Sequence, residues 1–300
     1  MQIKISIIIP AYNNTFLTKN CLESIIENTC TDNYEIIVID NGSDMDFIQE
    51  ISTMSLNNSK IKYIRNEMNL GFAKACNQGA RSANGKYLVF LNNDTLITNN
   101  NWLSELIEPL IDNQETAICG AKLLYPDKTI QHGGIGFFKG NPIHLYRNKK
   151  HNYPPANRKK FLNAVTAACF SINKTDFFDI GQFDENFING FEDVDFCLRT
   201  ISIGKKILFN PACEVIHLEE KTKGRKDKDK FNFDLLVSKH SIFPDDLKMI
   251  FQSDGVKLKK IFLSLLPNKG KMAGYSAFYL DRGLVFIFKH IIKRILNRKK

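Results

Sequence analysis

The sequence has no run of apolar residues long enough to cross a bilayer, which takes about 20 residues in a helix. Its first apolar run, residues 5–9, stops at Pro10 and is too short for the core of a secretory signal peptide. We therefore expect neither a spanning helix nor a leader. Hydrophobic residues make up 43% of the chain, which is enough for a sizeable core and argues against a disordered protein.

Cysteine pairs with the short spacing of zinc ligands are also missing. The seven cysteines are odd in number and scattered along the chain, and none belongs to a CxxC pair. This pattern is typical of reduced, mostly buried thiols in a cytosolic compartment. It argues against a zinc site.

A basic body is absent as well, although the net charge is +9. Residues 256–300 hold twelve Lys or Arg and one acid, Asp281, whereas residues 1–255 hold 29 basic and 31 acidic side chains. A nucleic-acid-binding protein usually spreads its positive charge over the folded domain. We therefore expect no nucleic-acid partner, and we assign the positive charge to a C-terminal tail.

The first 110 residues alternate between β-branched runs and segments with helical periodicity. Continuous apolar runs are typical of parallel strands buried on both faces, and apolar residues three to four positions apart indicate helices. The alternation predicts an α/β fold with a Rossmann-like, mostly parallel central sheet flanked by helices. The predicted strands are residues 5–9, 35–39, 61–64 and 87–91, and the predicted helices are residues 15–28, 73–83 and 102–111.

After residue 110 the pattern is less regular. The long basic stretch 133–160 indicates a mobile flap or binding loop, and the charge run 219–232 indicates a solvated loop. In residues 284–296 the apolar side chains share one helical face and the basic ones the other, which predicts a basic amphipathic helix. Further predicted elements are strands 117–124, 165–172 and 206–209 and a helix over 193–203.

Several of the predicted strands end in polar residues. In an open α/β sheet, ligands bind beyond the carboxyl ends of the strands. Asp40 follows one strand and suits a ribose or base edge, and Asp94 follows another and suits a hard cation that bridges phosphates. Each also has a purely structural interpretation, because Asp40 can bond to its own turn and Asp94 can cap the next helix.

Three acids, Glu192, Asp193 and Asp195, lie in an otherwise apolar neighbourhood. A carboxylate crowded by other acids suits a general base, but acids are also favoured at any helix N-terminus. Arg199 stands four residues after Asp195 and is a suitable partner for it, which leaves Asp193 for chemistry. His217, at another strand end, is either a metal ligand or a satisfied core histidine.

Together these features resemble the inverting family 2 glycosyltransferases of the GT-A fold. The NNDT, FDENF and EDVDFCLR segments are most similar to the rhamnosyltransferase-like subgroup, which builds bacterial surface polysaccharides. The resemblance covers roughly residues 1–220. It is carried by IIIPAYNN (7–14), VIDNGSD (38–44), NLGFAKACNQG (69–79), FLNNDT (90–95) and residues 180–217.

The resemblance implies a role for each matching residue. Asp193 would be the general base, with Glu192 as its catalytic neighbour, and Asp94 with His217 would hold Mn²⁺ or Mg²⁺. The nucleotide-sugar site would be formed by Pro10, Tyr12, Asn13, Asp40, Asn69, Lys74, Asn77 and Asn93. Two features depart from the family pattern: residues 92–94 contain one acid instead of two, and Lys74 stands where close relatives often have a small residue.

The resemblance also implies how the chain is divided and what it does. The catalytic domain would span 1–220, with a nucleotide-binding half (about 1–110) and an acceptor half (about 111–220), followed by a charged linker and helix (221–255) and a membrane-associating tail (256–300). The donor would be dTDP-rhamnose, a UDP-hexose or a UDP-N-acetylhexosamine. The acceptor would be a glycan or lipid-linked glycan of O-antigen, capsule or lipooligosaccharide, at the cytoplasmic face of a bacterial plasma membrane whose anionic surface binds residues 256–300.

Two other classes of protein fit parts of the pattern. A nucleotidyltransferase acting on a sugar phosphate also uses a strand-end Asp and a cation, but it usually needs a glycine-rich loop after the first strand, which residues 10–14 lack. A catalytically degenerate glycan-binding protein is the non-enzymatic alternative. The presence of both Asp94 and Asp193 argues against it.

Overall fold

The computed structural model describes residues 4–219, 228–241 and 243–256. Its contacts divide the chain into two units, residues 1–246 and residues 247–300. The first unit carries the sheet and every residue of the candidate site. In the second unit the described part contains the helix α8 (Leu247–Ser253). The domain limits at 220 and 255 that the resemblance implies stay predictions.

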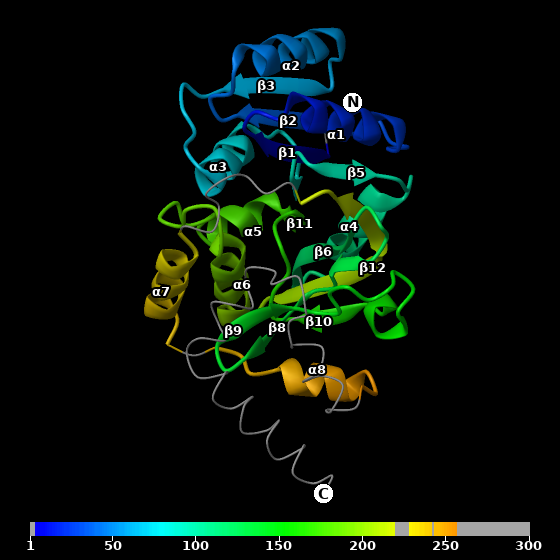
Figure 1. The fold of residues 1–300 in the computed structure, drawn as a ribbon, viewed down its shortest axis with the longest axis vertical. Helices are drawn as coiled ribbons and strands as arrows, with labels where there is room; N and C mark the ends of the chain where they lie inside the picture. The colour runs from blue at the N-terminus through cyan, green and yellow to red at the C-terminus, as the bar shows by residue number, and fades with distance from the viewer. Residues whose placement is uncertain (1–3, 220–227, 242, 257–300) are drawn as a thin grey trace, which may run out of the picture. The chain divides into compact units, whose positions relative to one another are not determined.

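A mixed sheet runs through the first unit, with strand order β10-β12-β6-β11-β4-β1-β2-β3. Strands β1, β2, β3 and β4 are parallel, and every residue of β1 is buried, as its continuous apolar run predicts. The helices α1 and α2 pack beside each other in this half, which is blue to cyan in Figure 1. The elements are β1 (Ile5–Ala11), α1 (Thr15–Glu27), β2 (Tyr34–Asp40), α2 (Met45–Asn57), β3 (Ile61–Arg65), α3 (Phe72–Ser82) and β4 (Tyr87–Leu91).

The second half of the sheet begins with an antiparallel strand. β11 lies between β4 and β6 and is antiparallel to both, while β6 and β12 are parallel to each other. Short strands β5 and β7 pair with β12 and β6 outside the main order. The elements are β5 (Thr95–Ile97), α4 (Trp102–Asp112), β6 (Thr116–Leu124), β7 (Ile130–His132), β10 (Lys160–Leu162), β11 (Cys169–Asn173), α5 (Lys174–Asp179), α6 (Glu192–Ser202), β12 (Lys206–His217) and α7 (Asp229–Lys239).

The predicted fold class is confirmed, and the structure corrects several boundaries. Residues 165–168 form a turn ahead of β11 instead of the start of a strand. The stretch 133–160 contains the hairpin of β8 (Ile135–Phe138) and β9 (Asn141–His144) and the short helix η1 (Pro154–Asn157). The helix α2 was not predicted. Its buried face consists of Phe47 and Ile51, too few residues for a clear periodicity, but Asp44 caps it by accepting a hydrogen bond from the N–H of Phe47 at 3.0 Å.

Two predictions fall on parts of the chain with little described structure. The charge run 219–232 was expected to be a loop, but its last residues lie in α7; residues 220–227 are outside the described residues. The amphipathic helix predicted over 284–296 also lies outside them. Over the ranges that the structure does describe, no helix is both long and apolar enough to span a membrane. All seven cysteines are free thiols and six are buried, as expected.

Candidate active site

The loops that follow β1 and β2 are joined to each other by side-chain hydrogen bonds. The Asn13 N–H donates to the Ser43 hydroxyl at 2.8 Å, and the Asn13 amide oxygen accepts from the Asp44 N–H at 3.0 Å. Asn13 adopts a left-handed φ of 53°, which Asn tolerates better than most residues. Pro10 is buried in β1, whereas Tyr12 is 41% exposed beside this junction. The carboxyl ends of β1 and β2 therefore form one preorganised edge.

The carboxylate of Asp40 is enclosed at this edge. Its oxygens accept hydrogen bonds from the Ser43 N–H at 2.8 Å and from the Tyr63 hydroxyl at 2.5 Å, and Arg65 lies 3.4 Å away. Burial and the hydrogen bond to Asp40 raise the pKa of Tyr63 well above its usual value, so the phenol stays a donor. The side chain of Asp40 is 0% exposed, which matches the structural interpretation of this residue as the acid of a turn. Its contact with a nucleotide stays a prediction.

The remaining candidates for nucleotide binding fall into two groups. Asn69 and Lys74 are exposed, and Asn69 accepts from the Gly71 N–H at 2.9 Å, ahead of α3. Asn77 is buried and uses its amide on the chain at Phe183, with bonds of 2.9 and 3.1 Å to the backbone C=O and N–H. Asn93 donates to Thr18 of α1 at 2.8 Å. Asn77 therefore joins α3 to the segment that leads to α6, instead of presenting its amide to solvent.

Asp94 and His217 meet although 123 positions separate them. Strands β5 and β12 pair Thr95 with His217, and this places the imidazole Nε2 3.0 Å from the Asp94 Oδ1. Both residues are buried. The Gln131 Oε1 lies 2.6 Å from the His217 Nδ1, and an amide oxygen can only accept, so in the neutral ring the proton is on Nδ1. The lone pair of Nε2 then faces the Asp94 carboxylate.

This pair fits a hard divalent cation. Two acceptors opposite each other repel unless a proton or a metal cation lies between them, and neighbouring ligands of an octahedral ion at ~2.1 Å stand about 3.0 Å apart. The Asn92 Nδ2 lies 3.3 Å from the same Nε2. The Oδ1 of this amide is buried, and no described residue donates a hydrogen bond to it. Oxygen and imidazole donors suit Mn²⁺ or Mg²⁺. In the described part of the chain, no group of three His, Cys, Asp or Glu side chains is gathered as a metal site.

The three acids of the block occupy different environments at the start of α6. Asp195 is fully buried and accepts from Arg199 at 2.9 Å, as predicted from their spacing. Glu192 is buried and accepts from the Gly190 N–H at 2.6 Å. Asp193 is half-buried, and its two oxygens accept from the N–H groups of Ala167 at 3.1 Å and Val194 at 2.8 Å. These bonds orient the Asp193 carboxylate.

The turn formed by residues 165–168 connects the two halves of the candidate site. Its Ala167 N–H donates to Asp193, while its Ala168 C=O accepts from the Asn92 N–H at 3.0 Å.

The same turn is supported by His132. The Thr166 N–H donates to the His132 Nε2 at 3.4 Å, and the His132 Nδ1 lies 2.9 Å from the Nδ1 of His144. Burial, with smaller contributions from His144 and His217, lowers the pKa of His132 well below its usual value. A neutral His132 thus supports the turn.

The sequence motifs did not point to Gln131, His132 or the 165–168 turn. Gln131 is 86 positions from His217, and the groups that hold Asp193 are backbone N–H groups, which leave no signature in residue type. One signal was available, the strand predicted over residues 165–172, because that range includes the turn. Sequence motifs mark the side chains that do chemistry, but the backbone groups that orient them leave no mark in the sequence.

Solved structures share this fold at low sequence identity. The mannosyltransferase PcManGT from Pyrobaculum calidifontis, in complex with GDP-Man and Mn²⁺, aligns with a TM-score of 0.59 and 13% identity over 95% of this chain and 80% of its own. GalNAc-T7 with UDP, GalNAc and Mn²⁺ gives a TM-score of 0.59 and 20% identity over 88% of this chain and 56% of its own. The fold is therefore that of the GT-A glycosyltransferases.

The sequence comparison narrows this class to one family. The model of glycosyl transferase family 2 matches residues 6–181, and the chain belongs to this family. An uncharacterized protein of Sinorhizobium fredii is 29% identical over 74% of the chain, and the O-antigen biosynthesis protein RfbC of Myxococcus xanthus is 27% identical over 72%. The chain spans 25% and 17% of the lengths of these two relatives.

Proposed function

We propose that this protein is an inverting glycosyltransferase that moves a sugar from a nucleoside-diphosphate sugar to a hydroxyl group of a growing bacterial surface glycan. The observation that carries the proposal is the 165–168 turn, which bonds both to Asn92 of the strand end that bears Asp94 and to Asp193. The same four residues thereby contact Asp193, the proposed base for the acceptor hydroxyl, and the strand end that bears Asp94, one of the two residues that would hold the cation.

In this proposal Asp193 is the general base. Its carboxylate takes the proton from the acceptor hydroxyl as that oxygen bonds to the anomeric carbon of the donor, and the bond from that carbon to the diphosphate breaks. Attack from the face opposite the leaving group inverts the anomeric centre, so no covalent intermediate on the enzyme is required. The two N–H groups that donate to the Asp193 oxygens fix the orientation of this carboxylate.

Asp94 and His217 are the residues that would hold the divalent cation. A bound cation of this kind supplies Lewis-acid stabilisation of the charge that grows on the leaving diphosphate, worth several kcal/mol. Gln131 fixes the ring of His217 through its Nδ1, and such partners of a ligand typically change metal affinity by about 10–100-fold. The edge formed by Pro10, Tyr12, Asn13, Asp40, Asn69 and Lys74 would receive the nucleotide, with Asn77 and Asn93 as supports of its walls.

The proposed substrates follow from the family and its relatives. RfbC is named for O-antigen biosynthesis, which supports a surface-glycan acceptor, in lipopolysaccharide or capsule. For the donor we propose dTDP-rhamnose, a UDP-hexose or a UDP-N-acetylhexosamine. A lipid-linked acceptor would place the enzyme at the cytoplasmic face of the plasma membrane, held there by the basic residues of 256–300.

One assay tests the proposed function. The full-length protein is incubated with Mn²⁺, a lipid-linked or soluble glycan acceptor and a panel of nucleotide sugars, and release of nucleoside diphosphate is measured together with the anomeric configuration of the product. Release of nucleoside diphosphate with inversion supports the proposal. Release of pyrophosphate from a nucleoside triphosphate and a sugar phosphate would identify a nucleotidyltransferase instead. Binding of glycan without release of either product would identify a degenerate glycan-binding protein.

A further inference from the structure

The chain that leads into α6 has an unusual backbone. Asn189, Gly190 and Phe191 have φ values of 53°, 156° and 69°, so three successive residues lie in the left-handed half of conformational space. For a bulky residue such as Phe191 this conformation is unfavourable and persists only where the surroundings impose it. Glu192 and Asp193 follow directly. The position of the proposed base therefore depends on whatever holds residues 188–191.

The helix α7 holds this segment through Asn232. The Asn232 side chain is 0% exposed, its Oδ1 accepts from the Ile188 N–H at 2.9 Å, and its Nδ2 donates to the Ile188 C=O at 2.8 Å. The same amide thus satisfies both backbone groups of the residue before the strained stretch. Next to it, the rings of Phe233 and Phe191 lie with their centroids 5.9 Å apart. A side chain about 40 positions downstream defines the approach to α6.

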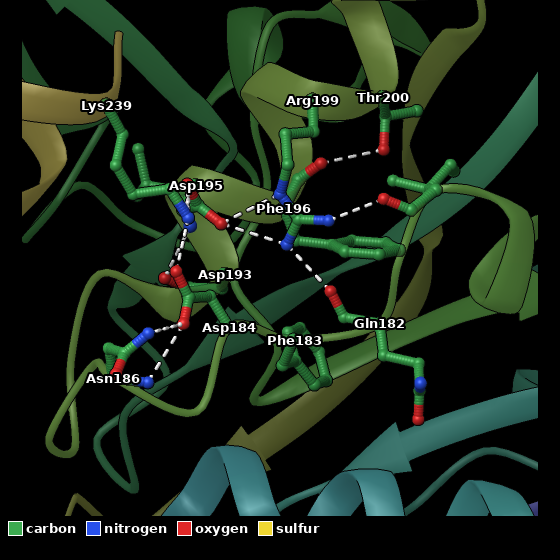
Figure 2. Close-up of polar contacts among 12 residues, drawn as sticks. Gln182, Phe183, Asp184, Asn186, Asp193, Asp195, Phe196, Arg199, Thr200 and Lys239 are labelled. Carbon is green, nitrogen blue, oxygen red and sulfur yellow. Dashed lines mark hydrogen bonds and ion pairs between the residues drawn. The ribbon is translucent and has the colours of Figure 1, made fainter.

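The C-terminal end of α7 is anchored to two acids, Asp184 and Asp195. Lys239 forms ion pairs with Asp184 and, at 3.1 Å, with Asp195, and the His240 Nε2 lies 2.9 Å from the Asp195 Oδ1. Figure 2 shows Lys239 reaching between these two carboxylates, with Arg199 on the other side of Asp195. Asp195 is fully buried, and a buried carboxylate needs such partners. The helix α7 is therefore fastened at one end to the loop before Asp193 and at the other to the helical turn after it.

We infer that Asn232 is a positioning residue for the transfer reaction: by binding both backbone groups of Ile188 it imposes the left-handed path of residues 189–191 and so sets the place of the Asp193 carboxylate. This inference rests on the proposed function of Asp193. It extends the catalytic machinery to α7, which lies beyond residues 6–181 that match the family model. The helix α7, which follows β12, then positions the proposed base in addition to connecting the sheet to the C-terminal residues.

The test compares variants of the full-length protein in the nucleotide-sugar assay. Asn232→Leu keeps the approximate size of the side chain and removes both bonds to Ile188. We expect kcat to fall by about 10²-fold, as for a base displaced by about 1 Å, with donor KM and nucleotide Kd within about twofold of wild type. Asn232→Asp keeps the acceptor for the Ile188 N–H, and its kcat should lie between those of wild type and Asn232→Leu. Val237→Ala, at a position 46% exposed on the same helix, is the control and should leave kcat unchanged.

A double-mutant cycle separates positioning from a general structural role. Asp193→Glu keeps a carboxylate but already displaces it, so adding Asn232→Leu to Asp193→Glu should lower kcat much less than it does in wild type. Equal factors in both backgrounds would overturn the inference, and so would wild-type kcat in Asn232→Leu. If Asn232→Leu does not fold, Asn232→Asp is used in the same cycle. Wild-type activity of Asp193→Asn would instead overturn the proposed role of Asp193, whatever Asn232 does.

Discussion

At the scale of single residues, aspartates of the same chemistry differ in burial and in the groups that contact their carboxylates. Asp195 is fully buried between Arg199, Lys239 and His240, and Asp40 is enclosed by Tyr63, Ser43 and Arg65. Such saturated acids hold structure together. Asp193 is half-buried, and its oxygens are oriented by backbone N–H groups. This difference in environment, more than the acidity of the block as a whole, sets Asp193, the proposed base, apart from the two structural acids.

Replacing Asp193 with Asn should nearly abolish transfer and leave nucleotide binding intact. The amide keeps the size of the side chain but cannot accept the acceptor proton, and general-base catalysis is typically worth ~10²–10⁴-fold in rate. Turnover and calorimetric nucleotide affinity, measured on the same preparation, check this. Activity within a few-fold of wild type would move the base elsewhere, with Glu192 as the next candidate.

Replacing Asp94 with Ala should lower both metal and donor affinity, since the variant leaves His217 as the remaining proposed ligand of the pair. Mn²⁺ binding by calorimetry and donor KM at fixed Mn²⁺ are the measurements. The matched control is Asp112→Ala at an exposed position of α4, which should change neither. Full wild-type activity in excess EDTA would contradict a metal-assisted reaction and would point to basic groups at the diphosphate.

The buried His132 predicts a pH dependence of stability. Its folded-state pKa is depressed below the ordinary value of 6.5, so below that pH the unfolded chain binds a proton that the folded protein does not. Stability should therefore fall as the pH drops below 6.5, with a slope of up to about 1.4 kcal/mol per pH unit from this group. Chemical denaturation of wild type and His132→Gln measures it. Above about pH 5, where carboxylates contribute little, the variant should show the smaller slope; equal slopes would contradict the assignment.

At the scale of elements, the loops at the carboxyl ends of the strands are packed backbone against backbone. Gly42, just after β2, has a φ of 81°, and a Cβ there would lie 2.7 Å from the Met68 Cα. The loop after β3 is held on the same turn, because the Asn66 N–H donates to the Asp40 C=O at 2.8 Å. The proposed nucleotide edge is thus a stack of loops in which no spare volume remains at Gly42.

Gly42→Ala should therefore destabilise the protein and weaken nucleotide binding. Gly204→Ala is the matched control, since Gly204 has the same φ of 81° but a Cβ there would have no described neighbour within 4 Å. We expect Gly204→Ala to cost ~1–2 kcal/mol from backbone strain alone, and Gly42→Ala to cost ~1–3 kcal/mol more from the clash. Denaturation and nucleotide calorimetry distinguish them. Equal costs with unchanged affinity would show that the loop after β3 yields freely.

At the scale of the whole molecule, the charge is divided between a near-neutral body and a basic tail. Residues 1–255 have 29 basic and 31 acidic side chains, against twelve and one in residues 256–300. Each Lys or Arg close to an anionic leaflet contributes ~1 kcal/mol to binding. The apolar face of the helix predicted over residues 284–296 would add insertion into the bilayer, which charge alone does not supply.

Removal of residues 256–300 should abolish binding to anionic liposomes. Full-length and truncated proteins are sedimented with anionic and with neutral vesicles, at low and high salt. We expect full-length protein to bind anionic vesicles and to retain part of that binding at high salt through the apolar face. The truncated protein must first bind nucleotide with wild-type affinity, as a check of its fold. If it then sediments as well as the full-length protein, the tail is not the anchor.

Much of the fold was readable from local pattern. The strands β1, β2 and β4 are continuous apolar runs, and α1 and α3 carry regular apolar stripes, so short-range periodicity alone identifies them. The direction of β11 was not readable, because a strand buried on both faces has the same pattern whichever way it runs. α2 was missed because it buries few residues and owes its start to one capping carboxylate.

The sequence by itself determined the fold class, the family and the residue types available for chemistry, since these depend on periodicity and on the order of motifs along the chain. Only the tertiary structure decided how they are used. It brought Asp94 to His217, oriented that ring with Gln131, placed the Ala167 N–H on Asp193 and laid Asn232 against Ile188. Each of these contacts joins segments at least 26 positions apart, often through backbone groups. The identity of a residue reveals neither which distant segment it will contact nor which backbone group will bind it.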